Sequence, residues 1–214
     1  DDNSAKELRR TLTGIGADLS GIVEVPGRLT TRKTRVFARN QQLLRVDRET
    51  TEPVSAEVAD ALAATCRALL DSVDGVLFSD YAKGALTNGW VRETIKAAKA
   101  RKLLVTAGPK PDSVGIYAGA TLLSFNRSEA AQAAGTPIRD LDSLIETGKR
   151  LVAALNVEAL VVTRGGEGAS LFGRNGSVEH IAPRPVQVFD ECGAGDTFLT
   201  AATLALAGGT DFKE

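Results

Sequence analysis

An aspartate closes a run of small residues near the end of the chain. The segment reads Asp190-Glu191-Cys192-Gly193-Ala194-Gly195-Asp196-Thr197 and lies between an expected strand at Val186–Phe189 and an expected helix at Phe198–Ala207. Small residues at a helix start leave backbone N–H groups unobstructed, so Gly193, Ala194 and Gly195 could form an anion hole. Asp196 beside it could accept the proton of a substrate hydroxyl, as phosphoryl transfer requires. The alternative is a plain glycine turn in which Asp196 only stabilises the first helical turn.

A second pair of oxygen donors follows another apolar run. Asn126 and Glu129 come after the expected strand at Thr121–Ser124. An amide oxygen and a carboxylate suit Mg²⁺, bound directly or through water. The same spacing is that of a capping box, with Asn126 as N-cap and Glu129 three residues later. The two roles are compatible.

Single residues near other strand ends are weaker candidates. Gly165 and Gly168 leave room for a close approach by a nucleotide and equally suit a tight hairpin. Lys110 is a candidate phosphate contact, although a solvated loop lysine looks the same in sequence. Lys83 and Asp80 could contact sugar or phosphate, although Asp80 could instead cap the turn that follows it.

Several kinds of site are disfavoured by the residues. The sequence has neither a G-x-x-x-x-G-K-[ST] loop nor a G-x-G-x-x-G fingerprint. His180 is the only histidine, and we expect a structural role for it because we identify no Ser or Cys partner nearby. Cys66 and Cys192 are too few for a disulfide framework or a zinc site.

Overall charge and hydropathy also exclude some partners. The net charge of -1 gives no reason to expect binding to nucleic acid or to an anionic membrane. No apolar run approaches the roughly 18 residues of a membrane span. The charge is nevertheless uneven along the chain, because one basic stretch contains a single acid, Asp47. This stretch is either a solvated strand edge or a surface for an anionic small molecule. Its basic residues are Arg28, Arg32, Lys33, Arg35, Arg39, Arg45 and Arg48.

Buried strands alternating with helices must position these residues. Four short apolar runs without polar alternation predict strands that are covered on both faces. They are Gly75–Phe78, Leu103–Val105, Thr121–Leu123 and Ala159–Val162. Helix-like segments lie between and beside them, at Ser55–Leu70, Thr87–Ala100, Ser128–Ala134 and Leu141–Leu155. This order predicts an α/β fold, a mostly parallel sheet with helices on both faces whose ligands bind at the carboxyl ends of the strands.

Two regions depart from that order. Residues 22–48 look β-rich, with strands expected at Ile22–Val25, Thr34–Ala38 and Leu43–Val46, and could form a small lid sheet. Residues 168–189 alternate in the same way and predict a meander.

The motifs, taken in order, resemble the ribokinase-like carbohydrate kinases of the PfkB family. Gly193-Ala194-Gly195-Asp196 resembles the family signature, Asn126-Arg127-Ser128-Glu129 its N-x-x-E element, and Val162-Thr163-Arg164-Gly165-Gly166-Glu167-Gly168-Ala169 its T-x-G-x-x-G turn. Two further stretches resemble the branch of the family that phosphorylates heptose 7-phosphate. They are Ser79-Asp80-Tyr81-Ala82-Lys83-Gly84-Ala85-Leu86 and Arg39-Asn40-Gln41-Gln42-Leu43-Leu44-Arg45-Val46-Asp47.

The resemblance implies a partial ribokinase-like kinase domain over residues 1–214, using ATP and Mg²⁺ to phosphorylate a sugar or sugar phosphate. It implies Asp196 as catalytic base and a nucleotide and magnesium site built from Asn126, Ser128, Glu129, Thr163, Gly165 and Gly168. Candidate contacts to substrate or phosphate are Arg35, Asn40, Gln42, Asp80, Lys83 and Lys110. It further implies an enzyme of lipopolysaccharide precursor biosynthesis and a homodimer formed through the lid. The two cysteines, too few for a disulfide framework, separately predict a reducing, cytoplasmic compartment.

The sequence also departs from the family. In the family, an N-terminal segment with an aspartate and a glycine pair contacts the acceptor, and it has no counterpart here. The chain also stops at Glu214, where relatives continue with residues that close over the adenine. We therefore expect a chain that is incomplete at both ends. Glu191-Cys192 replaces small or hydroxyl residues, and Gly108 stands where relatives have Asp or Asn. Two alternatives therefore stay open: a non-catalytic nucleotide- or sugar-binding remnant, or a kinase of the same family for an unphosphorylated sugar or nucleoside.

Overall fold

The computed structural model describes residues 2–39, 41–184 and 192–212. The chain divides into two compact units, each treated by itself below. The first comprises Asp1–Cys66 and Ala82–Trp90, and the second Arg67–Tyr81 and Val91–Glu214. The expected Val186–Phe189 strand lies outside the described residues.

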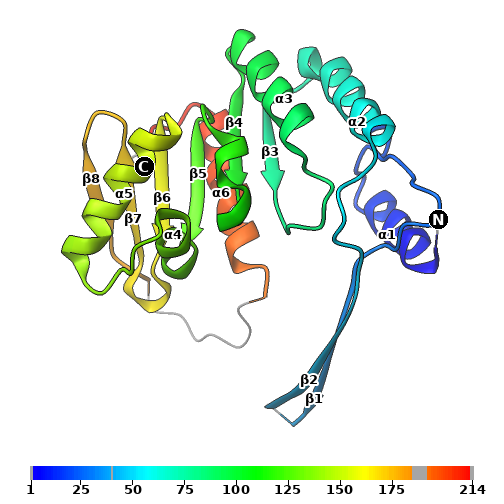
Figure 1. Cartoon of the computed structure of the whole chain (residues 1–214), viewed down its shortest axis with the longest axis horizontal. Coiled ribbons are helices and arrows are strands. Elements are labelled where there is room, and N and C mark those ends of the chain that lie inside the picture. The colour runs from blue at the N-terminus through cyan, green and yellow to red at the C-terminus, as the bar shows by residue number, and fades with distance from the viewer. Residues whose placement is uncertain (1, 40, 185–191, 213–214) are drawn as a thin grey trace. The chain divides into compact units, whose positions relative to one another are not determined.

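The second unit is built on a six-stranded sheet in the order β3-β4-β5-β6-β7-β8 (Figure 1). Its strands are β3 (Gly75–Ser79), β4 (Leu104–Gly108), β5 (Leu122–Asn126), β6 (Ala159–Thr163), β7 (Ala169–Gly173) and β8 (Val178–Ile181). Neighbours from β3 to β6 pair in parallel, whereas β7 and β8 are antiparallel. The parallel strands therefore end along one edge, where ligands bind in α/β sheets.

Helices connect the parallel strands as the apolar runs predict. They are α3 (Asn88–Ala100), the 3₁₀ helix η2 (Pro111–Tyr117), α4 (Arg127–Ala134) and α5 (Leu141–Leu155). Helix α6 (Ala194–Ala207) comes later in the chain, after β8. Helix α5 occupies the predicted residues because capping residues define both of its ends. Asp140 and Ser143 form a capping box at its start, and Asn156 adopts the left-handed conformation at its end.

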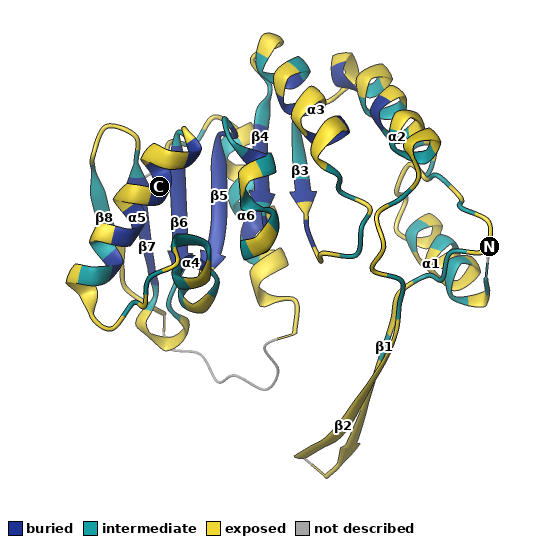
Figure 2. Ribbon diagram, viewed as in Figure 1, coloured by how far each residue is buried: buried dark blue, intermediate teal, exposed yellow. Residues whose placement is uncertain are grey.

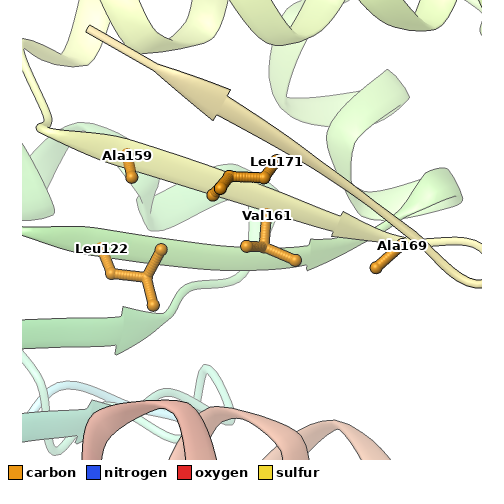
Figure 3. Close-up of a cluster of buried hydrophobic side chains, with 5 residues drawn as sticks. All are labelled: Leu122, Ala159, Val161, Ala169 and Leu171. Carbon is orange, nitrogen blue, oxygen red and sulfur yellow. The ribbon is translucent and has the colours of Figure 1, made fainter. Parts of the chain in front are cut away.

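The sheet packs against helices on both faces, which explains its unbroken apolar strands. On one face, a cluster of buried side chains meets apolar residues of α6, among them Phe198 and Ala202. Figure 3 shows this cluster, formed by Leu122, Ala159, Val161, Ala169 and Leu171. On the opposite face, Phe172 is fully buried against Gly148 of α5, where an added Cβ would lie 2.6 Å from the ring. Figure 2 shows the resulting band of buried residues through β4, β5, β6 and β7.

The first unit contains α1 (Asn3–Gly14), the hairpin of β1 (Arg32–Ala38) and β2 (Gln41–Arg48), and most of α2 (Ala56–Leu69). The hairpin has two unlike faces. Cross-strand partners lie on the same face, so the pairs Thr34–Val46 and Val36–Leu44 make one side largely apolar. The alternate pairs, Lys33–Asp47 and Arg35–Arg45, make the other side charged. A two-stranded sheet of this kind is marginally stable alone.

The predicted α/β class, with its small antiparallel sheet, is confirmed. Two local differences stand out. The expected strand at Ile22–Val25 is wrong, because these residues form no strand and pair with none of the strands in the described part of the chain. Helix α1 was not expected; Asp2 caps it by accepting hydrogen bonds from the N–H groups of Ala5 and Thr30.

Candidate active site

An open cleft of about 1520 Å³ lies at the carboxyl-end edge of the sheet in the second unit. It receives residues from the ends of β3, β4, β5 and β6 and from the start of α6. The predicted site residues that line it are Asp80, Lys110, Asn126, Ser128, Glu129, Thr163, Gly165, Gly168, Ala194, Gly195 and Asp196. The structure thus brings together most of the residues singled out from the sequence.

Helix α6 presents its N-terminus to this cleft. Gly193 is the N-cap and has a φ of 79°, a conformation that favours glycine. Ala194, Gly195 and Asp196 form the first turn and are exposed. Their backbone N–H groups have no acceptor within the helix because they precede its first hydrogen-bonded turn. An anion placed before the helix would meet these donors and the positive end of the dipole.

Packing against the sheet fixes the position of α6. Leu199 is 2% exposed, and the Thr203 hydroxyl lies 2.8 Å from that of Thr106 on β4. A Cβ on Gly108 would lie 3.2 Å from Leu199, so a larger residue here would press on the helix. This contact is a local reason for glycine at position 108.

The carboxylate of Asp196 is held by two hydroxyl groups. The Ser79 hydroxyl donates to Oδ1 at 3.0 Å and the Tyr81 hydroxyl to Oδ2 at 2.5 Å. The hydrogen bond to this carboxylate raises the pKa of Tyr81 above its ordinary value, so Tyr81 stays protonated as a donor. Neither hydroxyl was a candidate from sequence, although both lie within the stretch that resembles the heptose branch.

Asp80, between these two residues, points elsewhere. Its side chain is buried and accepts hydrogen bonds from Ser113 Oγ at 2.6 Å and Tyr117 Oη at 2.8 Å. Burial, with the neighbouring carboxylate, strongly raises the pKa of Tyr117. Asp80 therefore anchors η2, the segment that directly follows Lys110.

Asn126 and Glu129 form the capping box of α4. Asn126 Oδ1 accepts from the Glu129 N–H at 2.8 Å, and Glu129 Oε2 accepts from the Asn126 N–H at 3.0 Å. The second oxygen, Oε1, lies 2.6 Å from Lys110 Nζ. The capping role is thus confirmed, and Lys110 faces a carboxylate instead of standing free in solvent. Ser128 is exposed on the same turn, and its hydroxyl accepts from Gln132.

The turn between β6 and β7 forms another wall of the cleft. Thr163 donates to the Phe125 carbonyl at 3.3 Å, which joins the ends of β5 and β6. Gly168 has a φ of 86°, and a Cβ there would lie 2.0 Å from the Ile181 carbonyl oxygen. The hairpin therefore needs glycine at 168. Gly165 also has positive φ but has open space where a Cβ would stand.

Two arginines share one carboxylate beside this turn. Arg127 forms an ion pair with Glu167, and Arg164 Nη1 lies 3.7 Å from the same carboxylate. The Arg164 side chain is only 12% exposed. In the part of the chain that the structure describes, the buried Nε atoms of both arginines lack a hydrogen-bond partner. Both arginines line the cleft.

The remaining predicted substrate contacts belong to the first unit. Arg35 and Gln42 lie on the hairpin, and Asn40 lies outside the described residues. Lys83 Nζ forms an ion pair with Glu49 at 2.6 Å. Arg28 donates to the carbonyl oxygens of Glu52 and Lys83. Both side chains thus have structural partners within their own unit.

The expectation that His180 has no serine partner is wrong. His180 Nδ1 lies 2.9 Å from the hydroxyl of Ser170. The two residues face each other across the antiparallel pair of β7 and β8, a register that the sequence alone does not give. Ser170 is fully buried in the sheet, which supports the structural role expected for His180.

Known carbohydrate kinases include a family that matches the whole chain. The description "pfkB family carbohydrate kinase" matches residues 1–214. The chain belongs to this family. It is 44% identical over 213 residues to the bifunctional protein HldE of Geobacter metallireducens and 43% identical to that of Geobacter sulfurreducens. Each match spans 100% of this chain and 44% of the relative, so the chain covers less than half of those proteins.

Solved structures show the same fold at low sequence identity. Phosphofructokinase-2 from Escherichia coli, in complex with potassium, superposes with a TM-score of 0.80 at 17% identity over 99% of this chain and 68% of that one. Ribokinase of Arabidopsis thaliana, complexed with ribose and ATP, gives 0.76 at 20% identity over 100% and 68%. This pfkB-family chain is therefore ribokinase-like in architecture.

Two kinds of feature are absent from the described residues. No cluster of three or more His, Cys, Asp or Glu side chains suited to a metal occurs in residues 2–39, 41–184 and 192–212. Among the helices of that same portion, none has the length and apolar character to cross a membrane.

Proposed function

We propose that this pfkB-family protein transfers the terminal phosphoryl group of ATP to a hydroxyl of a sugar phosphate, and that the acceptor is heptose 7-phosphate. The observation that carries the proposal is the position of Asp196. Its carboxylate stands in the first turn of α6, in a cleft shared with Asn126, Glu129 and Lys110. A candidate base, an anion-binding helix start and a candidate magnesium site therefore line one cleft, which supports phosphoryl transfer there.

Asp196 accepts the proton of the acceptor hydroxyl as its oxygen attacks the phosphorus atom. The N–H groups of Ala194, Gly195 and Asp196 stabilise negative charge on the phosphoryl group during its transfer. The left-handed conformation of Gly193, the N-cap, orients these N–H groups towards the cleft. Because these donors belong to a helix packed on the sheet, they need no rearrangement during the reaction.

Asn126 and Glu129 fit Mg²⁺ held through water better than Mg²⁺ bound directly. One oxygen of Glu129 is engaged in the capping box, the other with Lys110, and Asn126 Oδ1 also serves the cap. Mg²⁺ in kinases keeps several waters and takes other ligands from phosphate, so one nearby carboxylate suffices. When bound, the ion neutralises charge on the nucleotide phosphates.

The nucleotide would lie along Ser128 and the turn from Thr163 through Gly165 to Gly168. Arg127 and Arg164 both line the cleft at this turn. Guanidinium groups form charge-assisted hydrogen bonds with phosphate oxygens, which supports a polyphosphate ligand here. Lys110 is a further phosphate contact in this arrangement.

The choice of a phosphorylated acceptor rests on resemblance and on charge. The stretches containing Asp80 and Lys83, and Asn40 and Gln42, resemble the heptose 7-phosphate branch. Arg35 lies on the charged face of the hairpin, opposite Arg45. In this proposal the hairpin is a candidate lid, and its basic residues are candidate contacts for the phosphate of the acceptor.

The apolar face of the hairpin supports a homodimer through the lid. Val36, Leu44 and Val46 are 41%, 48% and 56% exposed. Pairing with a second copy would cover them and would stabilise a sheet that is too small to stand alone. Use of ATP places such an enzyme in the cytoplasm.

Two assays of the full-length protein test the proposal. ADP formation is followed with a panel of acceptors: heptose 7-phosphate, the unphosphorylated heptose and a nucleoside. We expect turnover with the first and little with the others. Titration calorimetry with Mg²⁺-ATP separates a binding remnant from a kinase. Nucleotide binding without ADP formation in the presence of any of the acceptors would contradict the proposal.

A further inference from the structure

The two hydroxyl groups on Asp196 form an arrangement that family membership does not itself assign. Ser79 and Tyr81 are two residues apart, at the end of β3 and just beyond it, and both reach the carboxylate of Asp196. Asp80 between them turns to η2. The alternation of an extended chain thus directs two hydroxyls to one side and a buried carboxylate to the other.

The hydrogen bonds leave Asp196 able to act on a substrate. An ionised carboxylate has about four lone-pair sites. Ser79 uses one on Oδ1 and Tyr81 one on Oδ2, so each oxygen retains a further site. Because Asp196 is exposed in the first turn of a helix, little else in its surroundings restrains its rotamer.

We propose that Ser79 and Tyr81 are positioning residues: their hydroxyls clamp the carboxylate of Asp196 so that its remaining lone pairs face the acceptor hydroxyl in the cleft. This inference rests on the proposed function, in which Asp196 is the base. Neither residue needs to touch the sugar. Loss of either hydroxyl frees rotation of the carboxylate and lowers the fraction of time it spends in the reactive orientation.

A purely structural role does not suit these residues. Tyr81 is 52% exposed and Ser79 is also exposed, so removing either hydroxyl leaves the packed core unchanged. Tyr117 offers a matched contrast, since it donates to Asp80 from a fully buried position. Tyr117→Phe should lower the melting temperature, whereas Tyr81→Phe should not.

The kinetic test compares Tyr81→Phe, Ser79→Ala and Ser79→Thr with the wild-type full-length protein. We expect kcat to fall about 10- to 100-fold in the first two. The KM for ATP and the melting temperature should stay unchanged, and Ser79→Thr, which keeps the hydroxyl, should recover most of the loss. A kcat within twofold of wild type for Tyr81→Phe would overturn the inference. So would an effect confined to the KM of the acceptor, which would make Tyr81 a substrate contact.

A second readout does not depend on turnover. Ultraviolet absorbance titration follows tyrosinate formation, and subtracting the Tyr81→Phe curve isolates Tyr81 from Tyr117. The groups that act on the Tyr81 hydroxyl are Asp196, Ser79 and Cys192, with Asp196 raising its pKa most. Asp196→Asn removes the negative charge that opposes phenolate formation, so the pKa of Tyr81 should fall towards its ordinary value.

The titration of Tyr81 and the turnover of Asp196→Asn test the clamp and the catalytic base independently. An unchanged Tyr81 titration in Asp196→Asn would overturn the clamp even if that variant were inactive. Retained turnover in Asp196→Asn would overturn the proposed base, whatever the titration showed.

Discussion

Glu129 has two roles, helix cap and candidate magnesium residue, and substitution can separate them. Its Oε2 accepts from the Asn126 N–H at 3.0 Å, and its Oε1 lies 2.6 Å from Lys110 Nζ. Glutamine can still accept the capping hydrogen bond but carries no charge. Glu129→Gln therefore preserves the cap and removes the anion, whereas Glu129→Ala removes both.

The expected stability changes are small and ordered. The ion pair with Lys110 is partly exposed, the side chains being 21% and 40% accessible, so its loss costs about 0.5 kcal/mol. Loss of the capping arm in Glu129→Ala adds about 0.5–1 kcal/mol. Asn126→Ala, which removes the N-cap acceptor, should cost about 1 kcal/mol. At roughly 2–4 °C per kcal/mol, Glu129→Gln should melt within about 2 °C of wild type.

The functional effect should be larger than the effect on folding. We expect Glu129→Gln to raise the Mg²⁺ concentration for half-maximal rate about tenfold, equivalent to about 1.4 kcal/mol. The assay is ADP formation against Mg²⁺ at saturating ATP and acceptor, with melting curves on the same samples. Unchanged Mg²⁺ dependence in Glu129→Gln, with destabilised Glu129→Ala, would refute the metal role and leave a capping residue alone.

Three further predictions concern the walls of the cleft. Gly168→Ala should destabilise the protein by more than about 3 kcal/mol, because the added Cβ would clash with the Ile181 carbonyl oxygen. The control Gly166→Ala should be tolerated, because the space around that position is open, and thermal melting of both variants measures the difference. Tyr117→Phe should cost about 1.5–3 kcal/mol in denaturant unfolding, since it removes a donor from the buried Asp80; an unchanged midpoint would argue against that bond. Arg164→Gln should weaken ATP binding about tenfold by calorimetry and leave the acceptor KM unchanged, because Arg164 lines the cleft at the proposed nucleotide turn and the substitution removes its charge.

Local sequence patterns predicted the sheet and its functional edge well. The run at Ala159–Val162 is apolar on both faces because helices cover both faces of β6, and such a run has few other interpretations. Asn126 and Glu129 were recognisable because a capping box is a contact three residues long. Motifs of this kind can be recognised in the sequence because the residues that interact lie within one turn of the helix.

Features set by long-range geometry were not predictable in the same way. The hydroxyls of Ser79 and Tyr81 meet a carboxylate more than a hundred positions later, which depends on how α6 packs. The pairing of Ser170 with His180 depends on hairpin register. Residues Ile22–Val25 have the composition of a strand but no strand beside them, and composition does not reveal the partner.

The most direct test of the central claim is the rate of ADP formation by Asp196→Asn with heptose 7-phosphate and Mg²⁺-ATP, measured beside the Kd for ATP. The substitution keeps the shape of the side chain and removes its basicity. We predict that turnover falls at least a thousandfold, as expected when a general base is lost, while the Kd for ATP changes less than about threefold. Turnover within tenfold of wild type would contradict the assignment of Asp196 as the base.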